Sequence, residues 1–148
     1  MKVSVIIPVF NEEESIPVLY KQLREVLDRE PWDAELIMVD DGSSDRSAEI
    51  ISDIAKEDPR VRLVEFARNF GQTAAILAGI DYATGDVLIP MDADLQNDPE
   101  DIPRLLAKLD EGYDVVSGWR KERQDRLWSR RVPSMIANRL ISRWTGVA

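Results

Sequence analysis

The 148 residues of this sequence include neither cysteine nor histidine. Without cysteine there is no disulfide framework and no thiolate metal site. Without histidine the chain lacks the commonest general base and the commonest zinc ligand. Any acid–base chemistry must therefore use carboxylates, or a substrate must supply its own nucleophile.

Long apolar runs are missing as well. No stretch approaches the roughly 18 consecutive apolar residues of a membrane span, so we expect none. The first residues, 1–5, run directly into a predicted strand and lack the layout of a signal peptide. With 44% hydrophobic and 32% charged residues, the composition indicates one globular domain, and a cytoplasmic setting is the default expectation.

What the sequence does contain is a regular alternation of two patterns. Continuous apolar runs predict strands over residues 3–9, 35–39, 61–66 and 87–91, with a short fifth strand over 114–117. Apolar residues at helical spacing predict helices over 16–27, 48–55, 71–83 and 98–112, and a basic helix over roughly 128–144. The alternation predicts an α/β fold, a three-layer sandwich around a mainly parallel sheet.

Polar or acidic side chains follow three of the predicted strands: Asn11 and Glu12, Asp40 and Asp41, and Asp92 and Asp94. Open α/β sheets bind ligands at the carboxyl ends of their strands. Side chains two apart on a strand project to the same side, so the last pair suits Mg²⁺ or Mn²⁺ shared with a diphosphate. The other acids can accept hydrogen bonds from a ribose or a base. Helix capping and turn formation are the alternative for each cluster, but three clusters together favour a sugar-nucleotide site.

Charge is distributed unevenly along the chain. The net charge is −9, yet residues 119–148 are basic and contain three of the four tryptophans, Trp119, Trp128 and Trp144. An acidic body with a basic, Trp-bearing end indicates an anionic partner at one edge of the protein. The apolar positions of the predicted basic helix suit either a membrane surface or packing on the sheet.

Three motifs, in residues 5–13, 39–45 and 92–96, resemble the signatures of family 2 glycosyltransferases of GT-A type. Residues 68–72 and 94–99 more narrowly resemble the polyprenyl-phosphate branch. That branch includes dolichol-phosphate mannose synthases, bactoprenol glucosyltransferases and undecaprenyl-phosphate formamidoarabinose transferases. The resemblance implies a Rossmann-like nucleotide-diphospho-sugar transferase fold.

The resemblance also implies site residues. Those implied to line the nucleoside and ribose pocket are Pro8, Phe10, Glu12, Val39, Asp41 and Ala93. Those implied to hold the divalent metal and the diphosphate are Asp92, Asp94 and Gln96. Arg120 resembles an arginine that meets donor phosphate, while Arg130 and Ser134 resemble the residues that receive the acceptor's phosphate. For Arg130 a solvated helix face is the alternative.

The implied reaction is the inverting transfer of a sugar from a nucleoside-diphosphate sugar to a polyprenyl phosphate. A UDP-sugar is favoured as donor, with a GDP-sugar possible. A lipid phosphate is already ionised, so it attacks without a general base, and a histidine-free site suffices. The implied catalytic residues are Asp94, Arg120 and Arg130, which act by positioning and electrostatics around a Mg²⁺ or Mn²⁺ ion.

The resemblance further implies how the chain is organised. We expect residues 1–118 to form the donor-binding core, and 119–148 to form a basic segment of the same domain that faces acceptor phosphate and membrane. Because family members continue further, we expect the donor-binding part of a longer enzyme at the cytoplasmic face of a membrane. We expect such a part to bind the sugar donor and the metal ion but to transfer little sugar. We do not expect it to bind nucleic acid.

Two rival functions remain open. A nucleotidyltransferase shares a related plan, but it usually needs a Gly-rich, basic loop after the first strand. Residues 10–14 are acidic instead, and no Gly-rich phosphate loop occurs there. The second rival is a non-catalytic nucleotide-binding module that is anchored to a membrane by its basic end.

Overall fold

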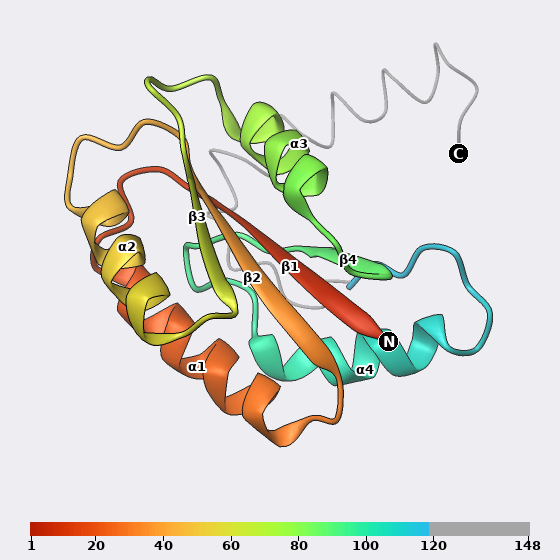
Figure 1. Ribbon diagram of the computed structural model, residues 1–148. Coiled ribbons are helices and arrows are strands. Elements are labelled where there is room, and N and C mark those ends of the chain that lie inside the picture. Colours follow the sequence, from red (N-terminus) through yellow and green to blue (C-terminus); the bar gives the residue numbers. More distant parts are fainter. Residues whose placement is uncertain (119–148) are drawn as a thin grey trace, which may run out of the picture. The chain divides into compact units, whose positions relative to one another are not determined.

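The computed structural model describes residues 1–118, and its centre is a four-stranded parallel sheet (Figure 1). The strands are β1 (Lys2–Val9), β2 (Asp33–Asp40), β3 (Val61–Glu65) and β4 (Val87–Pro90), in the order β3-β2-β1-β4. Val5 on β1 pairs with Leu36 on β2 and with Ile89 on β4. Since the strands are parallel, the loops that follow them gather at one edge, which we call the carboxyl edge.

Helices cover both faces of the sheet. They are α1 (Ser15–Arg29), α2 (Ser47–Glu57), α3 (Gln72–Tyr82) and α4 (Ile102–Leu109), with a 3₁₀ turn, η1 (Pro99–Asp101), before the last. Figure 1 shows α1, α2 and α4 on one face and α3 on the other. The predicted three-layer α/β sandwich with a parallel sheet is therefore confirmed.

The larger core lies between the sheet and the three helices that share a face. Alternate residues of β1, including Val3, Val5 and Ile7, are fully buried there against Leu19 and Leu23 of α1. The apolar spacing of α1 places these leucines on one stripe of the helix. Burial of that stripe, more than local propensity, stabilises the helix.

Helix α3 packs on the opposite face through small residues. Ala75 and Gly79 are its buried positions, and a Cβ atom at Gly79 would lie 2.3 Å from Cγ2 of Ile6. Only glycine allows so close an approach of helix to strand. The tightly packed, small-residue helix predicted over 71–83 is confirmed, although Leu77 on its outer side is 56% exposed.

One predicted element is wrong. Residues 114–117 form no strand, and Val115 is 82% exposed. A strand needs a neighbour to pair its backbone, and no strand of the described residues pairs with this segment. Residues 1–113 form one compact unit, and Asp114 to Ser117 lie beyond its end. The basic helix predicted over 128–144 lies outside the described residues.

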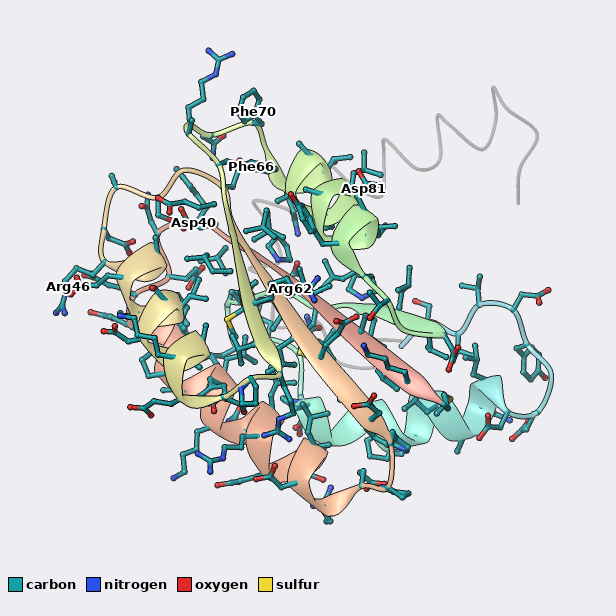
Figure 2. The ribbon with its side chains drawn as sticks, viewed as in Figure 1. Asp40, Arg46, Arg62, Phe66, Phe70 and Asp81 are labelled. Carbon is teal, nitrogen blue, oxygen red and sulfur yellow. The ribbon has the colours of Figure 1, made fainter. Side chains whose placement is uncertain are left out.

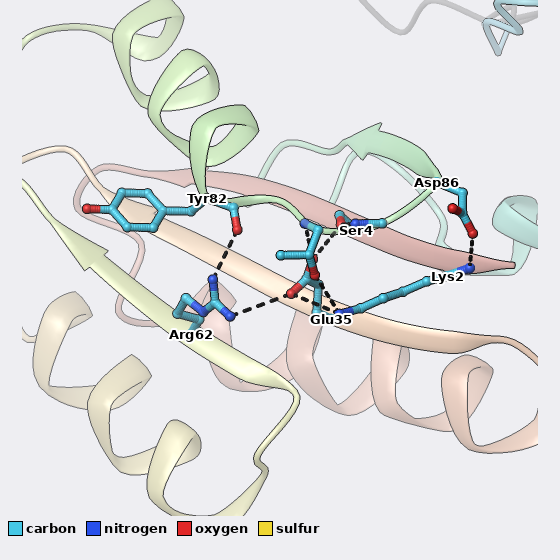
Figure 3. Close-up of polar contacts among 8 residues, drawn as sticks. Lys2, Ser4, Glu35, Arg62, Tyr82 and Asp86 are labelled. Carbon is cyan, nitrogen blue, oxygen red and sulfur yellow. Dashed lines mark hydrogen bonds and ion pairs between the residues drawn. The ribbon is translucent and has the colours of Figure 1, made fainter.

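We call the opposite end of the sheet, where the strands begin, the amino edge. A buried carboxylate, Glu35, connects residues from several segments there (Figure 3). Its Oε1 accepts hydrogen bonds from Ser4 Oγ at 2.6 Å and from the Thr84 backbone N–H at 2.7 Å. Its Oε2 lies 3.7 Å from Lys2 Nζ and 3.8 Å from an Arg62 guanidinium nitrogen. Burial alone would raise the pKa of Glu35, but the hydrogen bonds and Lys2 together lower it.

A second buried carboxylate, Asp58, lies just before β3 at the same edge. Arg60 donates to both of its oxygens, and Tyr20 Oη donates to Oδ2 at 3.0 Å. The hydrogen bonds from Arg60 are the main reason that the pKa of Asp58 is lowered to about 2.

No helix within residues 1–118 combines the length and the apolar character needed to cross a bilayer.

Candidate functional site

A cavity of about 320 Å³ opens at the carboxyl edge, where β1, β2 and β4 end. The residues that line it are Pro8, Val9, Phe10, Glu12, Asp41, Asn69, Gly71, Gln72, Asp92, Ala93 and Asp94. Most of the residues implied by the sequence to bind donor or metal thus meet in one space. Ligands of open α/β sheets bind at this kind of position.

The loops after β1 and β2 are joined by reciprocal hydrogen bonds. The Asn11 N–H donates to Ser43 Oγ at 2.9 Å, and the Ser44 N–H donates to Asn11 Oδ1 at 2.8 Å. The Glu12 N–H donates to Ser47 Oγ at 2.9 Å. Asn11 adopts a positive φ of 55° and caps no helix, because it bonds the neighbouring loop instead. These bonds fix the wall of the cavity that contains Phe10 and Glu12.

Asp41 is 3% exposed, and both of its carboxylate oxygens are engaged by the loop that precedes α3. Phe70 N–H donates to Oδ1 at 2.7 Å, and Gly71 N–H and Asn69 Nδ2 each donate to Oδ2 at 2.9 Å. The neighbouring Asp40 is also buried, and its Oδ2 accepts from Ser43 N–H at 3.0 Å. Asp41 therefore organises residues 69–71 besides lining the cavity.

The same loop lies directly on Gly42. That residue has a φ of 69°, and a Cβ atom there would lie 2.4 Å from the backbone carbon of Arg68. Within the loop, the Phe70 ring packs edge-on against Phe66 at 5.6 Å between centroids (Figure 2). The loop is thus held from below by Asp41 and Gly42 and from the side by an aromatic pair.

Asp92 and Asp94 lie on the loop that follows β4, and both line the cavity as predicted. Asp92 Oδ1 accepts a hydrogen bond from Gln72 Nε2 at 2.6 Å. Asp94 is exposed, and its Oδ1 accepts from Gln96 N–H at 3.1 Å across Leu95, which has a φ of 61°. Ala93, between the two acids, is buried.

Four acids at this edge form no ion pair with the residues that the structure describes. Within residues 1–118 no ion pair involves Asp40, Asp41, Asp92 or Asp94. In the same range no group of three or more His, Cys, Asp or Glu residues is arranged to hold a metal ion. Two carboxylates are the usual protein share of a Mg²⁺ site, since waters and substrate phosphates complete it. The donor set therefore fits a cation that binds together with a diphosphate.

Some predicted site residues lie elsewhere. The Val39 side chain is fully buried under α3, and neither Val39 nor Gln96 lines the cavity. Arg120, Arg130 and Ser134 lie outside the described residues. Conversely, the sequence assigned no site role to Asn69, Gly71 or Gln72, although all three belong to the segment 68–72 that carried the narrower resemblance.

The chain is similar to proteins of known name. It is 51% identical over 148 residues to the undecaprenyl-phosphate 4-deoxy-4-formamido-L-arabinose transferase of Enterobacter sp. (strain 638), which covers 99% of this chain. It spans 45% of the length of that relative.

Solved structures share its fold. S. aureus TarS 1–349 in complex with UDP-GlcNAc superposes with a TM-score of 0.62 at 22% identity, covering 89% of this chain and 42% of TarS. The mannosyltransferase PcManGT from Pyrobaculum calidifontis, in complex with GDP-Man and Mn²⁺, gives a TM-score of 0.51 at 27% identity. That match covers 62% of this chain and 27% of PcManGT.

The family itself is shown by nearly the whole sequence. Residues 4–146 match the profile described as Glycosyl transferase family 2, and the range includes all three motifs that carried the resemblance. Those motifs and the segment 68–72 together supply the residues that line the cavity at the carboxyl edge. The chain belongs to glycosyl transferase family 2.

Proposed function

We propose that the cavity binds a nucleoside-diphosphate sugar together with Mg²⁺ or Mn²⁺. We further propose that the protein transfers the sugar, with inversion, to a polyprenyl phosphate. The observation that carries the proposal is the pair Asp92 and Asp94, which line one cavity with Pro8 and Phe10 and have no cationic partner in the described residues. Acids that the fold leaves uncompensated attract a cation, and the cation in turn attracts a diphosphate.

The names of similar proteins support the donor and the acceptor. The 51% identical relative is named as a transferase acting on undecaprenyl phosphate. Structures with the same fold hold UDP-GlcNAc in one case and GDP-Man with Mn²⁺ in another. We favour a uridine nucleotide for this chain and keep guanosine as the second candidate.

The described residues divide the work of such a site. Pro8 and Phe10 provide an apolar wall for the nucleoside, and Glu12 and Asp41 are the nearby hydrogen-bond acceptors. Asp92 and Asp94 hold the cation, with Gln96 as a further proposed ligand. When bound, the cation stabilises the negative charge of the departing nucleoside diphosphate.

The acceptor side of the proposal rests on residues beyond Gly118. Arg120 would contact donor phosphate, and Arg130 with Ser134 would hold the acceptor phosphate in line behind the anomeric carbon. A phosphate that is ionised at neutral pH attacks unaided, so the lack of histidine is no obstacle. We propose that the basic segment 119–148 faces the cytoplasmic surface of a membrane.

Calorimetric titration of UDP-glucose, UDP and GDP tests the donor site, first with Mn²⁺ and then with EDTA. We expect uridine nucleotides to bind only with Mn²⁺, and Asp94→Asn to weaken that binding at least about 10-fold. Asp110→Asn, which removes an exposed carboxylate beyond the cavity, is the matched control and should bind like the parent chain. Unchanged binding by Asp94→Asn would instead support a metal-free nucleotide-binding module.

A further inference from the structure

A hydrogen bond joins Gln72 to the first acid of the proposed metal pair. Gln72 is the first residue of α3, and Asp92 follows β4, 20 residues later. The Gln72 Nε2 atom donates to Asp92 Oδ1 at 2.6 Å, and both side chains line the same cavity. The contact therefore joins the start of α3, which packs on the sheet, to the loop that follows strand β4.

Gln72 is held in place by the loop that precedes it. The buried carboxylate of Asp41 accepts hydrogen bonds from the backbone N–H groups of Phe70 and Gly71 and from the side chain of Asn69. Gly42 supports the same loop from below. Because the backbone is fixed immediately before Gln72, little backbone entropy is lost when its side chain meets Asp92.

The chemistry of the contact suits an acid that must bind a cation. An amide N–H restrains one carboxylate oxygen without adding positive charge, and it leaves the second oxygen and further lone pairs open. Lysine or arginine at this position would neutralise the acid and compete with the cation. Neutral partners that orient metal-binding carboxylates are known to affect metal affinity strongly.

We propose that Gln72 is a positioning residue for Asp92, which it aims at the cation of the donor complex. This inference rests on the proposed function, because it presupposes that Asp92 serves a cation. Asp41 then acts at a distance, since it fixes the loop that presents Gln72. Gln72 is assigned no direct contact with the nucleotide.

The test uses a variant of Gln72 that has a similar shape but lacks the hydrogen-bond donor to Asp92. Gln72→Met keeps the length of the side chain but loses the amide. Binding of Mn²⁺ in the presence of UDP is measured from the decrease of the electron paramagnetic resonance signal of free Mn²⁺. We expect about 10-fold weaker binding for Gln72→Met.

The matched control is Thr73→Ala, at the next, exposed position of α3. It should leave the binding of Mn²⁺ unchanged. Circular dichroism and the unfolding temperature report whether each variant keeps the fold. Binding of Mn²⁺ by Gln72→Met at the level of the parent chain would overturn the inference.

A double-mutant cycle separates positioning of Asp92 from direct contact with the nucleotide. If Gln72 acts through Asp92, Gln72→Met should cause no further loss in a chain that already carries Asp92→Ala. Additive losses would mean that Gln72 acts on the nucleotide and would overturn the inference.

The same cycle distinguishes this inference from the proposed function. Should Asp92→Ala and Asp94→Asn both bind Mn²⁺ and UDP like the parent chain, the proposed metal site falls and the inference falls with it. Should these variants lose binding while Gln72→Met does not, only the inference falls.

Discussion

The two edges of the parallel sheet treat their carboxylates in opposite ways. At the amino edge, Glu35 lies within ion-pair distance of Lys2 and Arg62, and Asp58 is bonded to Arg60. At the carboxyl edge, the described residues that donate hydrogen bonds to Asp41 and Asp92 are all neutral. One edge neutralises its acids internally, while the other keeps its negative charge available.

The difference separates stability from function along a single strand. Glu35 lies near the start of β2 and Asp41 follows directly after its end, and both are buried. A buried acid with cationic partners contributes to folding, but its charge is balanced by those partners and therefore does not attract a charged ligand. An acid held by amides remains able to shape a site that attracts a cation, which is why we locate function at the carboxyl edge.

Removing the Glu35 carboxylate from the amino edge should have the largest effect on stability. Glu35→Ala removes the acceptor of Ser4 and Thr84 and the partner of Lys2 and Arg62. We expect the free energy of unfolding to fall by about 3 kcal/mol in urea titrations. Glu49→Ala, which breaks an exposed pair with Arg46, should change it little.

The binding of UDP and Mn²⁺ by the folded Glu35→Ala chain should stay unchanged, since the cavity lies at the other edge. Loss of binding in a chain that is demonstrably folded would show that the two edges are coupled, and would contradict the separation drawn above.

The second acid of the amino edge makes stability depend on pH. The folded-state pKa of Asp58 is about 2, against an ordinary value of 3.8, so its contribution is complete above about pH 4 and is lost as the pH falls through 2. We expect this contribution to be about 2 kcal/mol.

The measurement compares urea unfolding of the parent chain and Asp58→Asn at pH 7, pH 4 and pH 2.5. The difference in unfolding free energy between the two chains should be full at pH 7 and shrink toward pH 2.5. A difference that stays constant with pH would mean that Arg60 does not hold the ionised form of Asp58.

Asp41→Asn should lower stability and should also disturb the site. The N–H groups of Phe70 and Gly71 donate to different oxygens of Asp41, so the single carbonyl oxygen of asparagine can accept from only one of them, and its NH₂ group faces the other. We expect a loss of about 2 kcal/mol in unfolding free energy, because one buried donor loses its acceptor.

The loop that presents Gln72 should loosen in the same variant, so binding of UDP with Mn²⁺ should weaken. In a chain labelled with ¹⁵N-glycine, which has seven glycines, the Gly71 amide resonance should move and its hydrogen exchange should accelerate. The Gly112 resonance, from a turn elsewhere, is the internal reference. An unmoved Gly71 resonance would mean that Asp41 does not hold the loop.

Sequence patterns predicted the local elements well. The strands expected over 3–9, 61–66 and 87–91 differ from β1, β3 and β4 by one residue at an end. For β1 the reason is that continuous apolar runs are typical of strands buried on both faces. The strand expected over 114–117 is absent, since β propensity cannot supply a partner.

The sequence predicted most of the residues of the site but not the hydrogen bonds that connect them. The acids after β1, β2 and β4 could be brought together from the sequence because parallel strands end at one edge. The contacts of Asp41 with Phe70 and of Gln72 with Asp92 span 29 and 20 residues, and no local pattern encodes them. The motif in residues 68–72 indicated that the segment matters, without indicating what it touches.

The sequence by itself determined the order of elements, the face that each buries, the family and the identity of the acids. These depend on periodicity and on residue type, both of which are local properties. Only the tertiary structure decided which acids are neutralised. Residues 69–103 contain no lysine or arginine, so any cation near Asp92 and Asp94 must come from elsewhere in the chain. Folding brings Lys2, Arg60 and Arg62 to one edge and leaves Asp92 and Asp94 without a cation in the described residues at the other.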